Sequence, residues 1–90
     1  MSPDYTLSYY IERAIAHAAY EKLEDGSYTA EITACPGVYS FGKTVEECRD
    51  ELRSVLEGWI LLGFQLHHHL PVIDGIDLNM RVELESLEPV

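Results

Sequence analysis

Residues 27–47 read SYTAEITACPGVYSFGKTVEE, an order that predicts a strand, a tight turn, a second strand and the start of a helix. In residues 27–33 apolar and polar side chains alternate with the period of two that is typical of a half-buried strand. Pro36 and Gly37 interrupt this pattern, because proline has no backbone N–H for a sheet ladder and glycine readily adopts positive φ. Residues 38–41 then form a second short strand, which the next glycine ends.

The long helix that follows is the best-defined element in the sequence. Thr44 and Glu47 form a capping box, in which the two side chains satisfy backbone N–H groups that the first turn leaves free. Apolar side chains then keep a helical period, at Val45, Cys48, Leu52, Val55, Leu56, Trp59, Ile60 and Gly63. Charged side chains occupy the other face, at Glu46, Glu47, Arg49, Asp50, Glu51, Arg53 and Glu57. We expect this helix to cover one face of a small antiparallel sheet, with Trp59 as its main anchor.

A shorter helix and a hairpin strand are predicted before this segment. The apolar stripe of the helix consists of Leu7, Tyr10, Ile11, Ala14, Ile15 and Ala18. Thr6 or Asp4 can cap its start. Residues 19–23 are expected to form the first hairpin strand, because the turn-forming residues 24–27 separate them from the next strand.

The pattern of the last part of the chain predicts a further strand. The apolar side of this strand in turn predicts a homo-oligomer. Residues 77–85 alternate again, with Leu78, Met80, Val82 and Leu84 on one side. A 90-residue chain has little core in which to bury that side, and short sheets have exposed edges. We therefore expect a homo-oligomer, most simply a twofold dimer in which this strand or the N-terminal helix crosses the interface.

These elements predict one α+β domain over residues 1–90. It has two layers: an antiparallel sheet of three to four strands, and a long amphipathic helix packed on it, with a short N-terminal helix beside them. Residues 1–18 form the N-terminal helix, residues 19–75 the core strands and helix, and residues 76–90 the C-terminal strand and acidic tail.

The charge of the chain limits its partners. Sixteen acidic residues against six basic ones give a net charge of −10. Such a surface repels the phosphate backbone of a nucleic acid, so direct DNA binding is not expected, and it attracts a basic protein. The sequence also lacks a membrane-spanning apolar run and a signal peptide, and two cysteines in such a chain are more often free thiols, so we expect a cytoplasmic protein.

No catalytic, cofactor or metal site is predicted. Consecutive residues point in different directions on a helix or a strand, so His67, His68 and His69 cannot ligate one metal ion together and are interpreted as a polar loop. The carboxylates of the long helix occupy its solvated face, and paired catalytic carboxylates need a concave pocket. His17 is interpreted as a helix C-terminal residue favoured by the helix dipole. We predict that the chain is not an enzyme.

An alternative function rests on the aromatic residues, which could stack the bases of single-stranded RNA on the sheet. The candidates are Tyr9, Tyr10, Tyr20, Tyr28, Tyr39, Phe41 and Trp59. Only Lys22 and Lys43 lie near the strands to hold phosphates, so most of these rings are better interpreted as core and interface residues.

The ordered series of motifs resembles the HicB family of type II antitoxins. The resemblance is carried by residues 28–32, by Pro36-Gly37-Val38-Tyr39, by residues 42–48, by the helix from Leu52 through residues 59–62 and by the proline-bearing segment Leu70-Pro71-Val72. It implies a partial double-stranded-RNA-binding-like or RNase-H-like α/β fold. It also implies a partner, a small basic HicA-like mRNA interferase that the antitoxin neutralises by covering its active surface.

One departure from the family concerns DNA. Many HicB members carry a C-terminal helix-turn-helix or ribbon-helix-helix domain that binds the operon promoter, and the short acidic stretch after Leu70 resembles neither. We predict that the toxin contacts six residues: Glu31, Tyr39, Phe41, Asp77, Glu83 and Glu85. The alternatives are a stand-alone RNA- or ligand-binding module, and an oligomeric domain without a toxin partner.

Overall fold

The structure, a computed structural model, describes residues 3–79 of the chain, with side chains from residue 7 onward. Two helices and three strands follow one another: α1 (Pro3–Ala16), β1 (Ala19–Lys22), β2 (Tyr28–Glu31), β3 (Tyr39–Gly42) and α2 (Val45–Gln65). The predicted α+β fold, with its long helix, short N-terminal helix and antiparallel sheet, is therefore confirmed.

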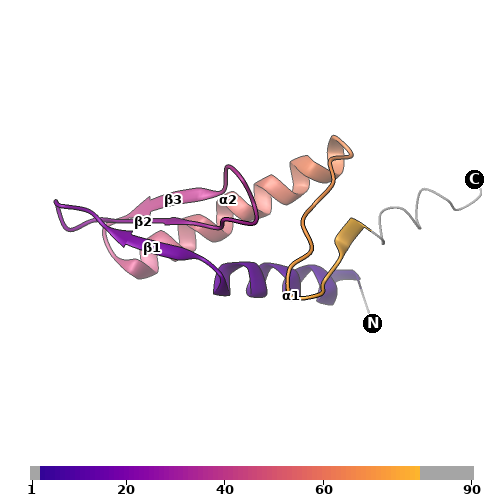
Figure 1. Cartoon of the computed structure of the whole chain (residues 1–90), viewed down its shortest axis with the longest axis horizontal. Helices are drawn as coiled ribbons and strands as arrows, with labels where there is room; N and C mark the ends of the chain where they lie inside the picture. Colours follow the sequence, from indigo (N-terminus) through magenta and orange to yellow (C-terminus); the bar gives the residue numbers. More distant parts are fainter. Residues whose placement is uncertain (1–2, 80–90) are drawn as a thin grey trace, which may run out of the picture.

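The sheet is antiparallel with the strand order β1-β2-β3, and α2 packs along one of its faces. Figure 1 shows α1 continuing away from β1 beyond the end of the sheet, while the segment after α2 returns to lie beside α1. Three strands are present in residues 3–79, and the outer face of the sheet has no helix over it. Residues 3–79 therefore form a helical layer and a sheet layer, with one face of the sheet left bare by this part of the chain.

The start of α2 shows the Thr44 half of the predicted capping box. Thr44 has extended backbone angles, and its hydroxyl Oγ1 accepts the backbone N–H of Glu47 at 3.1 Å. Immediately before it, β3 lies tight against the first turn of α2, because the Ser40 hydroxyl donates to the carbonyl of Cys48 at 2.8 Å. A Cβ atom at Gly42 would collide with the backbone of Cys48. Glycine is thus required here by close approach of two backbones.

The predicted caps of the N-terminal helix are wrong. The helix begins at Pro3, so residues 4 and 6 lie inside it and do not flank it. Proline is well suited to a first turn, because its fixed φ is helical and its missing N–H would have no intrahelical partner.

The core is formed mainly by α1, α2, the connection between β2 and β3, and the segment after α2. Its largest fully buried side chains are Tyr10, Ile32, Leu52, Leu56, Leu70, Val38, Cys35 and Cys48. Trp59 is only partly buried. It packs against the core from beside the fully buried stripe of α2, which includes Leu52 and Leu56, so the prediction that Trp59 is the main anchor is wrong.

The predicted C-terminal strand is contradicted where the structure describes it. Leu78 and Asn79 are helical, not extended, and residues 80–85 of the prediction lie outside the described part. The Asp77 carboxylate accepts the backbone N–H of Asn79 at 2.9 Å, a local bond that competes with strand formation. The Asn79 side chain in turn bonds both the N–H and the carbonyl of Leu70, which fixes the returning segment.

Candidate partner-binding face

The bare side of the sheet forms one continuous surface of six residues. Ala30 and Ser40 point towards α2 and are buried, so their neighbours along each strand point outwards. The strand register aligns these outward residues in two rows across the sheet: Ala19, Glu31 and Tyr39 in one, and Glu21, Thr29 and Phe41 in the other. We call these six residues the sheet face.

Two aromatic rings dominate the sheet face. Tyr39 is 60% exposed and Phe41 is 62% exposed, although both are large side chains that proteins usually bury or use in contacts. They line a shallow hollow of about 370 Å³ together with the other residues of the face. β3, which carries both rings, is an edge strand of the described sheet, so its outer backbone groups are available to a partner.

The charge of the sheet face is purely negative. Glu21 and Glu31 are both exposed, and the six residues include neither lysine nor arginine. Lys22 belongs to the opposite side of β1, because it pairs with Tyr28. Aromatic rings beside carboxylates bind lysine and arginine side chains well, through cation–π contacts and ion pairs.

The structure brings together three of the six predicted contact residues. Glu31, Tyr39 and Phe41 share the sheet face. Asp77 does not join them: its carboxylate holds Asn79, in the returning segment beside α1 (Figure 1). Glu83 and Glu85 lie outside the described residues.

Three further members of the face were not predicted: Ala19, Glu21 and Thr29. The signal for them was present in the sequence, because the hairpin turn fixes the register that places Glu21 opposite Thr29. Of the seven aromatic residues considered for RNA stacking, only Tyr39 and Phe41 lie on this face.

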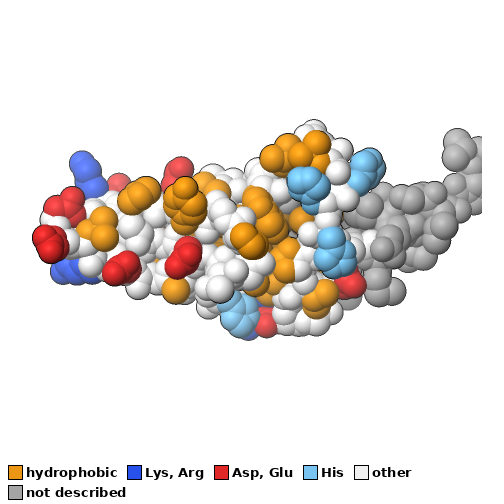
Figure 2. All heavy atoms as spheres, turned by 45° about the horizontal axis from the view of Figure 1, so that its top comes forward, with side chains coloured by type: hydrophobic (Ala, Val, Ile, Leu, Met, Phe, Trp, Pro, Cys, Tyr) orange, Lys and Arg blue, Asp and Glu red, His pale blue; other side chains and the backbone are white. Residues whose placement is uncertain are grey.

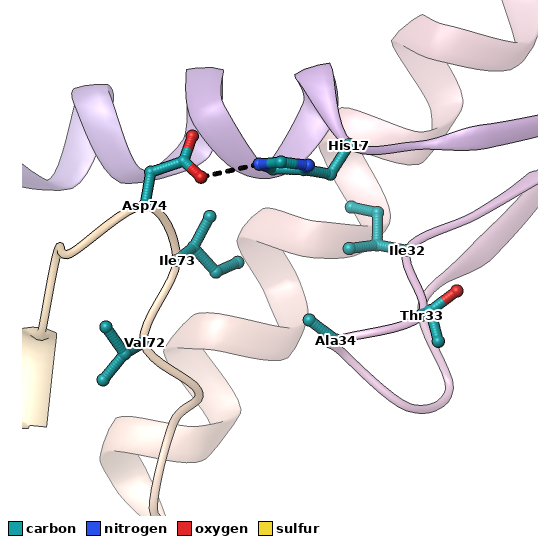
Figure 3. A pocket seen from close by; sticks show the side chains of 7 residues that line it. All are labelled: His17, Ile32, Thr33, Ala34, Val72, Ile73 and Asp74. Carbon is teal, nitrogen blue, oxygen red and sulfur yellow. Dashed lines mark hydrogen bonds and ion pairs between the residues drawn. The ribbon is translucent and has the colours of Figure 1, made fainter.

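A second polar cluster lies at the other end of the sheet, between α1 and the returning segment. One carboxylate oxygen of Asp74 accepts a hydrogen bond from Arg13 Nε at 2.6 Å, and the other oxygen lies 2.7 Å from His17 Nε2. Hydrogen bonds from Arg13 and His17 lower the pKa of Asp74. Figure 3 shows the His17–Asp74 contact at the rim of a hollow of about 330 Å³, whose walls include Ile32 and Val72.

Local sequence patterns contain no sign of this cluster. The helix dipole alone does not account for His17, because its ring pairs with a carboxylate 57 positions later in the chain. Asp74 has a left-handed backbone, with φ of 49°, in the tight turn before Gly75. Because one carboxylate, that of Asp74, contacts both Arg13 and His17, the cluster ties the returning segment to α1.

The remaining polar and nucleophilic groups do not converge on a site. His67, His68 and His69 are exposed in the turn after α2, and within residues 3–79 no three His, Cys, Asp or Glu residues are placed to share a metal ion. Cys35 and Cys48 are free, buried thiols. Burial raises the pKa of Cys35 to about 11, which keeps it protonated at neutral pH.

No helix in the described part of the chain combines the length and the apolar character needed to cross a membrane.

Comparison with known proteins places the chain in a family. Comparison with curated proteins gave no match. Among solved structures, the crystal structure of TTHA0281 from Thermus thermophilus is similar, with 36% sequence identity and a TM-score of 0.75. The alignment covers 80% of this chain and 90% of that one. A family model described as UPF0150-like matches residues 9–71, from α1 to the segment after α2. The chain therefore belongs to the UPF0150-like family.

Proposed function

We propose that this protein is an antitoxin that binds a small basic HicA-like mRNA interferase through the sheet face and so keeps the toxin from RNA. Membership of the UPF0150-like family, which is of the HicB-like antitoxin type, supports this class of function. The observation that carries the proposal is the pair of exposed rings, Tyr39 and Phe41, flanked by Glu21 and Glu31 on an uncovered sheet.

The chemistry of the face suits a protein that binds RNA. An enzyme that cleaves mRNA presents lysine and arginine to the phosphates, and a chain of net charge −10 attracts that surface over a distance. At contact, Tyr39 and Phe41 supply large apolar area at the centre, where aromatic residues usually contribute most of the binding energy. The carboxylates of Glu21 and Glu31 then occupy positions that RNA phosphates would otherwise take.

The protein itself acts in this proposal only by binding. Binding requires no reaction, cofactor or metal, and we assign it none. We also assign it to the cytoplasm, where mRNA is the toxin's substrate. The two free, buried thiols are compatible with a reducing compartment.

The test looks for a small basic protein encoded next to this chain and then measures its binding to the full chain. Calorimetry should show binding well below tens of micromolar. Tyr39→Ala and Phe41→Ala should each weaken it by about tenfold or more, because both rings are central anchors. Leu61→Ala is the matched control, since Leu61 is similarly exposed but belongs to α2, and it should leave the affinity unchanged.

Two outcomes would remove the proposal. One is the absence of a basic neighbour or of any binding at tens of micromolar. The other is binding that Tyr39→Ala, Phe41→Ala and Leu61→Ala all leave intact, since the toxin would then contact another surface.

The alternative of RNA binding is favoured only by the two exposed rings, because the sheet face carries no basic residue. It predicts an RNA affinity that falls steeply as salt rises. A filter-binding titration at low salt that stays flat would exclude it.

A further inference from the structure

The centre of the sheet face is a small side chain with larger ones around it. Thr29, on β2, lies directly opposite Glu21 on β1 and directly opposite Phe41 on β3. Glu31 is two residues further along β2, so it points to the same side of the sheet. Figure 2 shows acidic and hydrophobic side chains next to one another in the part of the molecule that holds the sheet. Thr29 therefore has a ring on one side, a carboxylate on the other and a second carboxylate along its own strand.

Differences in side-chain length make this centre a hollow. Opposite residues on neighbouring strands have Cβ atoms about 5 Å apart, and alternate residues of one strand are about 7 Å apart. The side chain of Thr29 is too short to fill that space, and Ala19, opposite Glu31, is shorter still. The hollow of about 370 Å³ therefore has Thr29 and Ala19 at its floor and the two rings and two carboxylates around it. Its shallow shape suits a group that is flat.

The two carboxylates of the sheet face have no cationic partner in the described part of the chain. The ion pairs there join Arg13 and His17 to Asp74, and Arg53 to Glu12. The six residues of the sheet face themselves include no lysine or arginine. Carboxylates attract a cation, and the faces of aromatic rings bind one as well. The hollow therefore suits a positive group that another molecule brings.

We infer that the hollow receives an arginine side chain of the basic partner. Its guanidinium lies against the Phe41 ring, and its N–H groups donate to the carboxylates of Glu21 and Glu31. A guanidinium is planar, weakly hydrated and carries N–H donors around its edge, so it can stack on a ring and bond carboxylates at the same time. A lysine ammonium is compact and strongly hydrated, and it has no plane to stack. This inference rests on the proposed function, which supplies a basic protein as the source of the arginine.

Another exposed apolar surface of the chain lacks this combination. Residues 58–66, the uncharged half of α2, include the exposed side chains of Leu61 and Leu62 but no carboxylate. An arginine gains no ion pair from these residues. A change at Leu61 therefore serves as the matched control for changes on the sheet face.

The first experiment compares three peptides, each titrated into the full chain and followed by NMR of the backbone amides. Hexa-arginine has end groups that are charged and planar, hexa-lysine has charged end groups without a plane, and hexa-citrulline has planar end groups without a charge. Hexa-arginine should bind at least about fivefold more tightly than hexa-lysine at the same salt concentration. Hexa-citrulline should not bind. The largest shifts with hexa-arginine should fall on Thr29 and Phe41.

Two variants test whether the preference for arginine belongs to the hollow. Phe41→Leu keeps an apolar side chain but removes the ring, and Thr29→Leu fills the floor of the hollow. Both variants keep the charge of the chain, so each should still bind hexa-lysine and lose most of the preference for hexa-arginine. Leu61→Ala should keep the preference. Melting curves show that the variants compared are folded, and either sheet variant alone suffices for the comparison.

The second experiment uses the toxin, with its arginines replaced by lysine one at a time. One replacement should weaken binding to the native chain by about tenfold, because the charge is kept and the planar group is lost. The same replacement should have little effect on binding to Phe41→Leu. Residues in contact show such non-additive effects, so this pair of changes identifies the arginine that enters the hollow.

The contrary results are specific to the inference. Equal affinities for hexa-arginine and hexa-lysine would overturn it, and so would a preference that both Phe41→Leu and Thr29→Leu retain. If the toxin needs Tyr39 and Phe41 but tolerates lysine at every arginine, the arginine inference is wrong and the proposed function stands. A preference for arginine on the sheet face of a chain that binds no toxin supports the arginine site and removes the proposed function.

Discussion

At the scale of single residues, the structure assigns strong roles to side chains that the sequence left unremarked. Asp74 holds Arg13 and His17 at once, and Asn79 satisfies both backbone groups of Leu70. These partners lie between 9 and 61 positions apart. A local sequence pattern predicts contacts only between residues of the same turn, helix or hairpin, so it could not predict contacts between residues this far apart in the chain.

The Asp74 cluster should make the stability of the protein depend on pH in the acid range. The pKa of Asp74 is lowered from its ordinary 3.8, so its contribution is fully present above that value and is lost as pH falls through the lower folded value. Asp74→Asn should therefore lower the melting temperature at pH ~6 and lose its effect near pH ~2. Glu24→Gln, at the exposed hairpin tip, is the control that should show no such difference. An equal effect of Asp74→Asn at both pH values would contradict the prediction.

The two glycines at positions 42 and 58 should respond oppositely to alanine. Gly42→Ala forces a Cβ against the backbone of Cys48 and should destabilise the fold by about 1–3 kcal/mol. Gly58→Ala meets no atom of its own chain and should raise the helix stability of the monomer by up to about 1 kcal/mol. Urea denaturation at a concentration low enough to keep the chain monomeric measures both. A Gly42→Ala variant as stable as the native chain would contradict the close approach at Gly42, and a destabilised Gly58→Ala variant would contradict the open space at Gly58.

At the scale of elements, the sequence predicted what local rules control. The capping box and apolar stripe placed α2 at nearly its observed bounds. Alternation placed β2, and the turn residues on either side of it placed β1 and β3. The prediction failed at the C-terminal strand, because Asp77 caps Asn79 locally, and at Trp59, because periodicity marks a stripe without saying which member lies at its centre.

The centre of the α2–sheet contact can be measured by truncation. Leu56 is fully buried, so Leu56→Ala should destabilise the protein by about 2–5 kcal/mol. Trp59 is only partly buried and still contacts water, so Trp59→Ala should be the milder change in spite of the larger side chain. Chemical denaturation of the two variants under identical conditions decides the order. A larger loss for Trp59→Ala would restore it as the main anchor.

At the scale of the whole molecule, charge and apolar surface are separated. Acidic side chains gather at the end that holds the β1–β2 hairpin and the start of α2, while the uncharged half of α2 lies towards the other end (Figure 2). The composition alone predicts that the protein surface is acidic, and the sequence pattern identifies three of the six residues of the sheet face. The other three residues can be assigned to this face only once the strand register is known. That the face is exposed can be seen only once both helices have been placed.

This distribution predicts how the protein finds a basic partner. Replacing Glu21 and Glu31 together by glutamine should slow association with the toxin more than it speeds dissociation, because surface charges mainly steer encounters. The association rate of the double variant should also fall less steeply as salt rises. Stopped-flow measurements over a range of salt test this, with Glu24→Gln as the control. An unchanged association rate would mean that the sheet face does not guide the partner.

The contacts between α1 and the returning segment have a consequence for how the chain acquires its shape during synthesis. Tyr10 donates its hydroxyl to the carbonyl of Pro71 at 2.8 Å, and Arg13 reaches Asp74 across the same distance in sequence, 61 positions. The first helix to leave the ribosome therefore cannot complete its docking until nearly all of the chain has been translated. The hairpin, β3 and α2 need only their own neighbours, and contacts between neighbours form fastest. A nascent chain can thus present Tyr39 and Phe41 while its first helix is still unattached.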